Sequence, residues 1–349
     1  MRTYIIAEAG VNHNGSERLA KMLIEGAANA GADAIKFQTF SAEKLAGKNA
    51  PKAQYQQDTT GEGSQFEMLK ALEFDNATFE RLIVHSKQCG IEFLSTPFDI
   101  DAAKFLVEAG MKRIKVPSGE LINHKFLREL ATFGKPMILS TGMATSGEIH
   151  EAVAVVKGVL EDSGLTTPLA EFCTILHCTS NYPTALGDVN LLALQTIAKQ
   201  TGLPVGYSDH TQGTLVSVGA VALGASIIEK HFTLDRNMEG PDHQSSLELP
   251  ELTQMVDQIR DIERALGSDV KQPTQSEIEM RMLARRSIKA KRNLEAGEIL
   301  DETMIDILRP ADGIEPKYFD AVVGRTLLSS VAAGESLQWD NLSGPILDA

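Results

Sequence analysis

Two histidines lie where both could bind one metal ion. His210 lies in the stretch GYSDHTQG and His231 in EKHFTLD, and each follows a short apolar run typical of a β-strand. A single histidine is more often structural. Two imidazoles on neighbouring strands, however, can each give one ring nitrogen to a divalent cation and leave positions open for water and substrate oxygens. We therefore expect a metal site at His210 and His231, whereas His243 falls in the following loop.

Two lysines and several serines have the chemistry of an anion site. Lys36 lies in the run DAIKFQ and Lys115 in RIKVPS. With the hydroxyls of Ser118, Ser140 and Ser208, their two ammonium groups would hold a phosphate or a carboxylate. A lysine on a strand can instead be a solvated surface residue, but inside a closed barrel it needs a partner.

Two carboxylates and one thiol complete the candidate groups. Glu8 and Glu120 could contact a polyhydroxylated substrate or shuttle a proton, and they could equally neutralise a lysine. A nucleophilic pair of His177 and Cys178 is not expected, because adjacent strand residues point to opposite faces. The GxGxxG, Walker-type and GxSxG motifs are absent, which argues against dinucleotide binding, P-loop phosphoryl transfer and serine hydrolase chemistry.

Eight repeats of a short apolar run and a helix-length amphipathic segment position these groups. The pattern predicts a (β/α)8 barrel, an α/β fold, whose parallel strands all end at the same mouth. The expected strands are TYIIAE, DAIKFQ, IEFLST, RIKVPS, PMILST, CTILHCT, LPVGYS and SIIEKHF. The expected helices cover 16–30, 75–89, 99–109, 124–133, 146–162, 188–200, 213–224 and 250–267.

The rest of the chain forms an insertion and a second domain. The polar segment 41–74 is expected to be a long loop over the mouth of the barrel. We predict a barrel domain at 1–268, a polar linker at 269–283 and a small β-rich domain at 284–349, where short apolar runs alternate with turns such as EAGE and AAGE.

Composition excludes several classes of protein. A formal net charge of −14 argues against a nucleic-acid binder. Three cysteines without CxxC spacing indicate neither a disulfide framework nor a structural zinc site, and they suit a reducing cytoplasm. No run is long enough for a signal peptide or a membrane span, so a cytoplasmic protein without membrane contact is expected.

Several stretches together resemble one family, the sialic acid (N-acetylneuraminate) synthases, which include legionaminate synthases. They are IIAEAGVNHNG, GADAIKFQTF, FLSTPFD, KVPSGE, ILSTGM, HCTSNYPT, GYSDHT, IEKHFTLD and GPDHQSS, while ARRSIKA and LRPADGI resemble the antifreeze-like (SAF) domain of that family. The resemblance implies an enzyme that joins phosphoenolpyruvate to an N-acylated amino sugar, with water, and releases phosphate by C–O bond cleavage. N-acetylmannosamine giving N-acetylneuraminate is the first expectation, and a 2,4-diacetamido-2,4,6-trideoxymannose giving a legionaminic acid is the alternative.

The resemblance also implies roles for individual residues. His210 and His231 would hold Mn²⁺, with Mg²⁺ or Co²⁺ as alternatives, near the open-chain aldehyde. Glu8 is expected to manage protons, on chemical grounds alone. Arg309 would reach the N-acyl group from the small domain of a partner chain, so a homodimer is expected. The residues expected to grip phosphoenolpyruvate are Lys36, Thr96, Lys115, Ser118, Ser140 and Ser208, and those expected to contact the sugar are Glu8, Gln38, Glu120, Tyr182 and Asp242.

One motif departs from the family pattern. Where bacterial N-acetylneuraminate-forming members typically read Cys-Thr-Asn-x-Tyr-Pro, this chain reads CTSNYP, with Ser180 in the place of the Asn and Asn181 displaced by one position. A shift of one residue turns a side chain to the other face, so Ser180 is expected to replace the Asn contact. Two other hypotheses remain open, a metal-dependent aldolase acting on pyruvate and a non-catalytic carbohydrate-binding protein.

Overall fold

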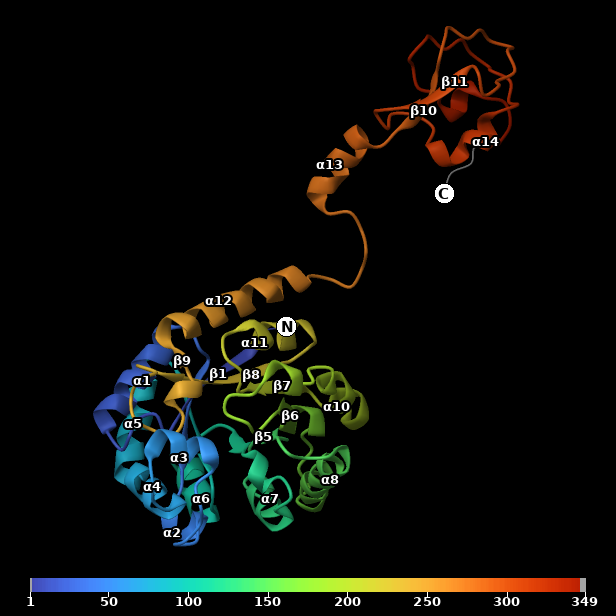
Figure 1. Cartoon of the computed structure of the whole chain (residues 1–349). Helices are drawn as coiled ribbons and strands as arrows, with labels where there is room; N and C mark the ends of the chain where they lie inside the picture. The colour runs from blue at the N-terminus through green and yellow to red at the C-terminus, as the bar shows by residue number, and fades with distance from the viewer. Residues whose placement is uncertain (1, 346–349) are drawn as a thin grey trace. The chain divides into compact units, whose positions relative to one another are not determined.

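The computed structural model describes residues 2–345 and divides into two compact units, Met1–Gly267 and Ser268–Ala349. The first unit contains a barrel of eight parallel strands in the order β3-β2-β1-β8-β7-β6-β5-β4, and β3 and β4 contact each other where the path ends (Figure 1). This confirms the predicted fold class. The strands are β1 (Tyr4–Gly10), β2 (Ala34–Thr39), β3 (Glu92–Pro97), β4 (Ile114–Val116), β5 (Met137–Ser140), β6 (Cys173–Cys178), β7 (Val205–Asp209) and β8 (Ile227–Thr233), and a short β9 (Leu247–Glu248) pairs with β8.

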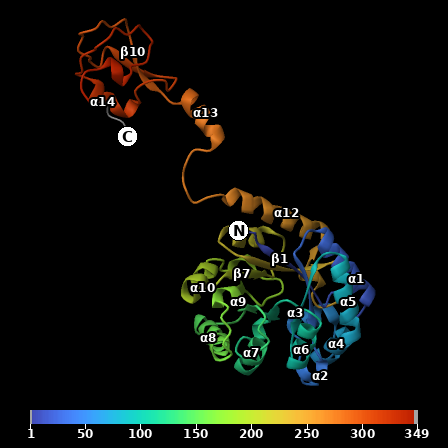
Figure 2. The ribbon, with the colours of Figure 1, turned by 180° about the vertical axis from the view of Figure 1, so that it is seen from behind.

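Helices surround these strands on the outside, as the view from behind also shows (Figure 2). Several begin at a side-chain cap that accepts a backbone N–H three residues later, as Ser16, Asp75 and Asp99 do. The outer helices are α1 (Glu17–Asn29), α5 (Asn76–Gln88), α6 (Ile100–Glu108), α7 (His124–Ala131), α8 (Ser146–Asp162), α9 (Leu169–Phe172), α10 (Ala193–Thr201), α11 (Leu215–Ala222) and α12 (Leu249–Leu266), with 3₁₀ turns η1 (Ser118–Glu120), η2 (Leu186–Asp188) and η3 (His243–Ser245).

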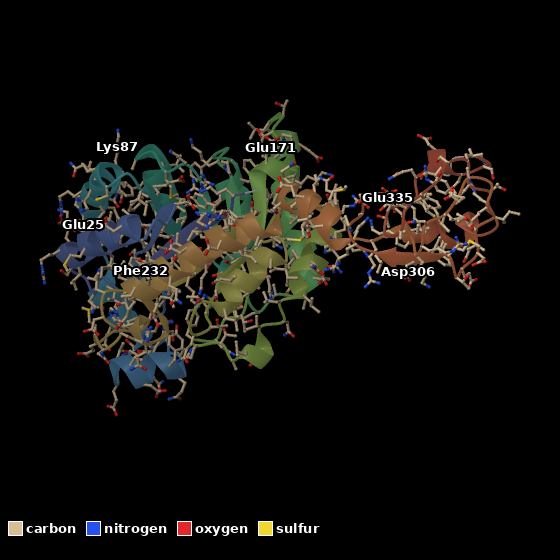
Figure 3. All side chains as sticks on the ribbon, turned by 90° about the horizontal axis from the view of Figure 1, so that it is seen from above. Glu25, Lys87, Glu171, Phe232, Asp306 and Glu335 are labelled. Atoms are coloured by element: carbon tan, nitrogen blue, oxygen red, sulfur yellow. The ribbon has the colours of Figure 1, made fainter. Side chains whose placement is uncertain are left out.

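Strand β8 shows how the barrel separates its two faces. Phe232 points outward and lies against α1, where a Cβ added to Gly26 would be 3.7 Å from the Phe232 ring (Figure 3). Lys230 also points outward, and its Nζ lies 3.0 Å from Asp209 Oδ2 with both side chains fully buried. The intervening residues, Glu229 and His231, therefore face the barrel interior.

The insertion at 41–74 contains more structure than the loop expected from its polar composition. It forms α2 (Ala42–Leu45), α3 (Gln54–Thr60) and α4 (Gln65–Leu72). Helix α4 begins at a reciprocal cap in which Ser64 Oγ accepts the Glu67 N–H at 3.2 Å and the Glu67 carboxylate accepts the Ser64 N–H at 3.0 Å. In both views these helices lie at the end of the barrel opposite the N-terminus, which is the end where the parallel strands finish (Figures 1 and 2).

Within the insertion, α3 has no buried residue. The buried ammonium group of Lys52, just before α3, holds the end of α3 and the residues that follow it. Its Nζ donates to Thr60 Oγ1 at 2.9 Å, to the Gly61 carbonyl at 3.1 Å and to the Glu62 carbonyl at 3.3 Å. All these acceptors belong to the insertion itself. Helix α2 and helix α4 contact each other, and Leu72 joins a small apolar cluster with barrel residues.

The second unit has its own apolar core. An antiparallel pair, β10 (Ser287–Ala290) and β11 (Ile305–Leu308), is extended by isolated bridges. Lys289 Nζ lies 2.9 Å from Asp312 Oδ1, and the ring of Trp339 lies 5.3 Å from that of Tyr318. The predicted linker contains most of α13 (Gln275–Ala284), and the unit also has α14 (Phe319–Val322), η4 (Pro316–Tyr318) and η5 (Trp339–Asn341). Its buried core residues are Ile288, Ala290, Leu294, Leu300, Ile305, Ile314, Val322, Leu327, Val331, Leu337 and Leu342.

No helix within residues 2–345 is both long and apolar enough to cross a membrane.

Candidate active site

A cavity of about 210 Å³ lies at the carboxyl ends of the barrel strands. Every strand of the barrel, or the segment that directly follows it, supplies at least one lining residue, as the parallel arrangement predicts. The cavity brings together these residues predicted from the sequence: Glu8, Lys36, Gln38, Thr96, Lys115, Ser118, Ser140, Ser180, Tyr182, Ser208, His210 and His231.

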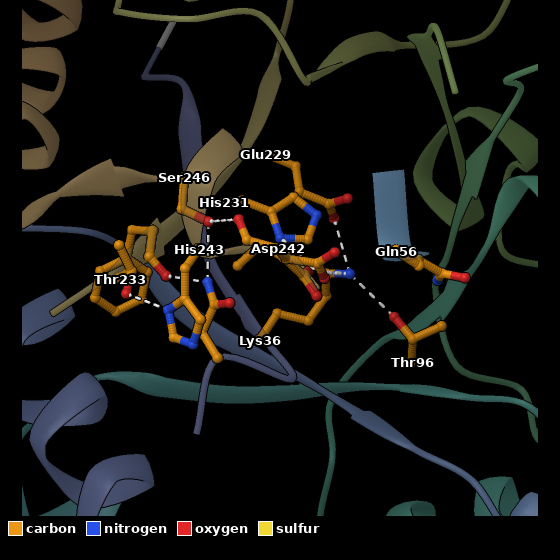
Figure 4. Close-up of polar contacts among 12 residues, drawn as sticks. Lys36, Gln56, Thr96, Glu229, His231, Thr233, Asp242, His243 and Ser246 are labelled. Atoms are coloured by element: carbon orange, nitrogen blue, oxygen red, sulfur yellow. Dashed lines mark hydrogen bonds and ion pairs between the residues drawn. The ribbon is translucent and has the colours of Figure 1, made fainter. Parts of the chain in front are cut away.

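Four buried charges lie in this cavity. Glu229 binds both lysines, with Oε1 3.3 Å from Lys115 Nζ and Oε2 3.4 Å from Lys36 Nζ. Lys36 also donates to Thr96 Oγ1 at 3.0 Å, as Figure 4 shows. In addition, Lys36 pairs with Glu8, and Ser208 Oγ donates to Glu229 at 3.0 Å. When all four groups are ionised, their charges cancel.

The environment shifts these groups in different directions. Burial raises the pKa of Glu8 to about 7, although the ammonium of Lys36 opposes this shift. Burial acts on Glu229 in the same sense, but Lys115 and Lys36 outweigh it and lower the pKa of Glu229 to about 2. Burial lowers the pKa of Lys115. Glu229 is therefore the permanent anion of the cavity, and Glu8 is the carboxyl group that can change its protonation state near neutral pH.

The two predicted metal ligands lie close together, with ring centroids 5.6 Å apart. His210 Nδ1 donates to the Thr179 carbonyl at 2.6 Å, which leaves its other nitrogen for a cation, and His231 Nδ1 has no hydrogen-bond partner. Burial lowers the pKa of His210 to about 4 and holds that of His231 well below its usual range, so both rings are neutral, as ligands must be.

A divalent cation fits this pair. At the usual nitrogen–metal distance of about 2.1 Å, rings at this separation can share one ion. Among the side chains of residues 2–345, no group of three or more His, Cys, Asp or Glu is arranged to hold a metal ion. Water and substrate oxygens would therefore complete the coordination at His210 and His231, leaving the open positions that catalytic sites keep.

Three predicted site residues do not line the cavity. Asp242 is buried with Oδ2 4.0 Å from His231 Nδ1, and burial raises the pKa of Asp242 to about 6. Glu120 lies on η1, and its carboxylate accepts a hydrogen bond from Asn123 at 2.7 Å. Arg309 follows β11 in the second unit, where it is exposed, and its role at a partner chain stays a prediction.

His243 is occupied by the protein. Its Nδ1 lies 2.7 Å from Thr233 Oγ1 and its Nε2 lies 3.1 Å from Asn14 Oδ1, as the close-up shows in part (Figure 4). Neither ring nitrogen is left for a cation, in agreement with the expectation that His243 is not a ligand.

Ser180 and Asn181 differ in the cavities that they line. Ser180 lines both the charged cavity and a neighbouring cavity of about 520 Å³, whereas Asn181 lines only the neighbouring one; the two cavities share Met143, Cys178 and Ser180. Among these two residues of the CTSNYP motif, Ser180 is therefore the one at the wall of the charged cavity, and its contact with a substrate stays a prediction.

Four aromatic rings lie together beside the cavity, with Tyr182 in contact with the other three. The ring of Tyr182 lies 4.1 Å from that of His210 and 5.7 Å from that of His231. Tyr55 from α3 stacks on Tyr182 at 5.3 Å. The insertion thus reaches the cavity wall through one aromatic side chain.

Sequence reasoning missed Glu229 and assigned no site role to Cys178, although both line the cavity. The signal for Glu229 was present, because a residue two positions before His231 on a strand faces the same side. Cys178 was judged only as a nucleophile, and burial does raise the pKa of its thiol.

Two ammonium groups, several hydroxyls and a neutral imidazole pair can together bind a small molecule that carries both a phosphate and a carboxylate beside a Lewis-acidic cation. The same barrel mouth offers a carboxyl group, Glu8, for proton transfer. The arrangement suits the joining of two small substrates at the barrel mouth.

Family models match almost the whole chain. The model described as NeuB family matches residues 23–271, and the model described as SAF domain matches residues 285–343.

Individual proteins match over similar lengths. The chain is 45% identical to N,N'-diacetyllegionaminic acid synthase of Legionella pneumophila, over 98% of this chain and 95% of that protein. It is 47% identical to N,N'-diacetyllegionaminic acid synthase of Campylobacter jejuni, over 93% of this chain and 95% of that protein. Among solved structures, an N-acetylneuraminic acid synthetase from Leptospira borgpetersenii in complex with citrate is similar with a TM-score of 0.71 and 36% identity, covering 80% of this chain and 90% of that chain.

Proposed function

The chain belongs to the NeuB family, and from this premise we propose that it condenses phosphoenolpyruvate with 2,4-diacetamido-2,4,6-trideoxymannose and water to form N,N'-diacetyllegionaminic acid and phosphate. The observation that carries this proposal is the buried cluster of Lys36, Lys115 and Glu229 among serine hydroxyls at the barrel mouth. Such a cluster suits a compact substrate with two anionic groups.

The relatives favour one of the two sugars expected from the sequence. The relatives from Legionella pneumophila and Campylobacter jejuni are both named for the diacetylated legionaminic acid, whereas the first expectation was N-acetylmannosamine. We therefore place the diacetamido sugar first and keep N-acetylmannosamine as the acceptor to compare it with.

In the proposed reaction, C3 of phosphoenolpyruvate attacks the aldehyde carbon, and the electron pair of the enol double bond forms the new C–C bond. The aldehyde oxygen takes up a proton while C2 becomes oxocarbenium-like. Water adds to C2 and loses one proton, which offsets the proton taken up by the aldehyde oxygen. The bond between C2 and the phosphate oxygen then breaks while the new C2 hydroxyl becomes the carbonyl group, and the hydroxyl proton leaves with phosphate as HPO₄²⁻. Every atom and charge of the two substrates and water is accounted for in the keto sugar acid and phosphate.

The residues of this chain supply binding, alignment and proton transfer. Lys36 and Lys115 would neutralise the carboxylate and phosphate, and the hydroxyls of Ser118 and Ser140 would donate to their oxygens. The proton of Ser208 is already donated to Glu229. Holding both reactants in one small cavity supplies the proximity that a weakly nucleophilic enol needs. A divalent cation bound by His210 and His231 would supply Lewis-acid polarisation of the aldehyde oxygen.

Glu8 is the group proposed to accept the proton that water loses at C2. It lies beside Lys36 and its pKa is raised to about 7 by burial, so the carboxylate can take a proton near neutral pH. Glu229 cannot serve in this way, because the two lysines hold it as an anion.

The test offers the purified full chain phosphoenolpyruvate with each sugar and follows the release of phosphate. Phosphoenolpyruvate labelled with ¹⁸O in the bridging oxygen should deliver the label to phosphate, as C–O cleavage requires. We expect a higher kcat/KM with the diacetamido sugar than with N-acetylmannosamine. If neither sugar releases phosphate, the proposed synthase function is wrong.

A matched pair of variants tests the anion site. Lys115→Met should raise KM for phosphoenolpyruvate at least about tenfold, because a charge-assisted contact is removed. Lys112→Met, at an exposed position just before the same strand, should leave KM unchanged. If both variants behave like the wild type, Lys115 does not bind the phosphorylated substrate.

The aldolase hypothesis makes a different prediction. An aldolase would use pyruvate directly, and the two lysines and serine hydroxyls would then have no phosphate to bind. Product formation from pyruvate and either sugar, without phosphoenolpyruvate, would favour the aldolase.

A further inference from the structure

Three polar side chains converge on Gly142, in the turn that follows β5. A Cβ added to Gly142 would lie 2.9 Å from Ser118 Oγ and 3.0 Å from Cys178 Sγ, and closer still to Ser180 Oγ. Only glycine leaves room for all three groups at this point. The turn is therefore built around the polar side chains of its neighbours.

The hydroxyl of Ser118 lies at the centre of this group. Its Oγ accepts the Gly142 backbone N–H at 2.9 Å and lies 3.2 Å from Cys178 Sγ. A serine hydroxyl has one donor proton and two acceptor lone pairs. If the thiol of Cys178 donates to Ser118 Oγ, both lone pairs are filled and only the O–H proton remains for the cavity.

The opposite arrangement would be unfavourable for an anion. If the Ser118 O–H donated to the sulfur, a lone pair of Ser118 would face the bound carboxylate or phosphate. Cys178 is only 5% exposed, and burial raises the pKa of its thiol, so the proton needed for donation stays on sulfur at neutral pH.

We propose that Cys178 is a positioning residue for phosphoenolpyruvate: its S–H, together with the Gly142 N–H, fills the lone pairs of Ser118 Oγ and turns the Ser118 hydroxyl proton toward the bound anion. The inference rests on the proposed function only in taking phosphoenolpyruvate as the anion. It explains why a thiol that cannot act as a nucleophile lines the catalytic cavity.

A double-mutant cycle tests the proposal. Calorimetry measures the Kd of phosphoenolpyruvate, and steady-state kinetics measure KM for each substrate, in the wild type, Cys178→Ala, Ser118→Ala and the double variant. We expect Cys178→Ala to weaken phosphoenolpyruvate binding about 3- to 10-fold, as for the loss of one hydrogen bond, without changing KM for the sugar. In the presence of Ser118→Ala, Cys178→Ala should have no further effect, because the group that it orients is gone.

Two further variants separate positioning from packing. Cys178→Ser keeps a donor at this position and should restore much of the affinity lost in Cys178→Ala. Cys173→Ala removes a buried thiol at the start of the same strand, away from the cavity, and should leave the Kd unchanged even where it lowers the melting temperature.

The outcomes are distinguishable. Equal effects of Cys178→Ala with and without Ser118→Ala, or an affinity in Cys178→Ser no better than in Cys178→Ala, would overturn the positioning role while leaving the proposed function intact. A wild-type protein that does not bind phosphoenolpyruvate at all would overturn both proposals.

Discussion

Replacing Glu229 by glutamine tests whether the buried charges are matched to a ligand. Glu229 accepts from Ser208 and lies within 3.4 Å of the ammonium groups of Lys36 and Lys115. The Glu229→Gln side chain has the same shape and can still accept a hydrogen bond from Ser208. It removes, however, the carboxylate that lies beside both lysines and whose pKa they lower to about 2. The free protein should then contain one excess buried positive charge, because Lys36 keeps its pair with Glu8 while Lys115 loses its carboxylate partner.

The expected loss of stability follows from the burial of this group. Removing one partner of a buried ion pair typically costs about 3–5 kcal/mol, and glutamine's remaining hydrogen bond favours the lower end. At about 2–4 °C per kcal/mol for large domains, a loss of about 3 kcal/mol should lower the melting temperature of the barrel unit by about 6–12 °C.

Phosphoenolpyruvate should reverse part of this loss, because its carboxylate and phosphate supply the missing negative charge. Saturation at about 100 times Kd stabilises a protein by about 2.7 kcal/mol. If the variant binds phosphoenolpyruvate about tenfold more tightly, the ligand stabilises it by about 1.4 kcal/mol more than the wild type. The shift in melting temperature on adding phosphoenolpyruvate should therefore be about 3–5 °C larger in Glu229→Gln.

Differential scanning fluorimetry at one fixed heating rate measures both quantities. The matched control is Asp209→Asn, which breaks a buried pair with Lys230 on the outside of the barrel. This control should lose a similar amount of stability but gain no extra shift from phosphoenolpyruvate. Two results would refute the idea that Glu229 and the substrate's anionic groups compensate the same lysines. One is a Glu229→Gln protein as stable as the wild type. The other is a change in its melting temperature on adding phosphoenolpyruvate that is no larger than that of the wild type.

Three further predictions concern other parts of the chain. Thorough removal of divalent metal should lower turnover by about 100-fold or more, and Mn²⁺ should restore it in the wild type but not in His210→Ala; full turnover of the metal-free protein would exclude the two-histidine site. Tyr55→Ala removes the ring that stacks on Tyr182 and should raise KM for the sugar about 3- to 10-fold, since such contacts contribute about 0.5–1.5 kcal/mol, while Tyr55→Phe should behave like the wild type in the same kinetic assay. In the second unit, hydrogen bonds from Ser336 and Lys289 lower the pKa of Asp312 to about 2. The stability that Asp312 adds should therefore be complete above about pH 4 and be lost as the pH falls toward 2. Unfolding followed by the fluorescence of Trp339, the single tryptophan, measures this loss, and Asp312→Asn should abolish that part of the pH dependence.

The barrel could be predicted from the sequence because each strand is a short apolar run and each helix has a regular amphipathic pattern. Those patterns show which side chains are buried. The strands of a parallel barrel are buried on both faces, and its helices bury one face, so the pattern of apolar residues indicates the type of each element. The insertion was predicted less well. Its polar composition suggested a loop, but the Ser64 and Glu67 cap begins α4, and Met68, Leu69 and Leu72 of that helix pack in a small apolar cluster.

The candidate site could be predicted in part for a related reason. Parallel strands finish at one mouth, so Lys36, Lys115 and His231 could be placed together from chain direction alone. What could not be derived was which group compensates which charge. Glu229 pairs with lysines on β2 and β4, and such long-range partners depend on the closure of the barrel, which strand patterns alone do not specify.

Helix α3 and its loop hold their shape by contacts of their own, whereas α2 and α4 are also tied to the barrel. Because the acceptors of the Lys52 ammonium all come from residues 60–62, α3 and its loop can keep these internal contacts if they shift together. Such a shift must break the stack of Tyr55 on Tyr182, at a cost of about one aromatic pair, or 0.5–1.5 kcal/mol. A cost of this size is small, so we expect α3 to move away from the barrel mouth without any unfolding of the barrel.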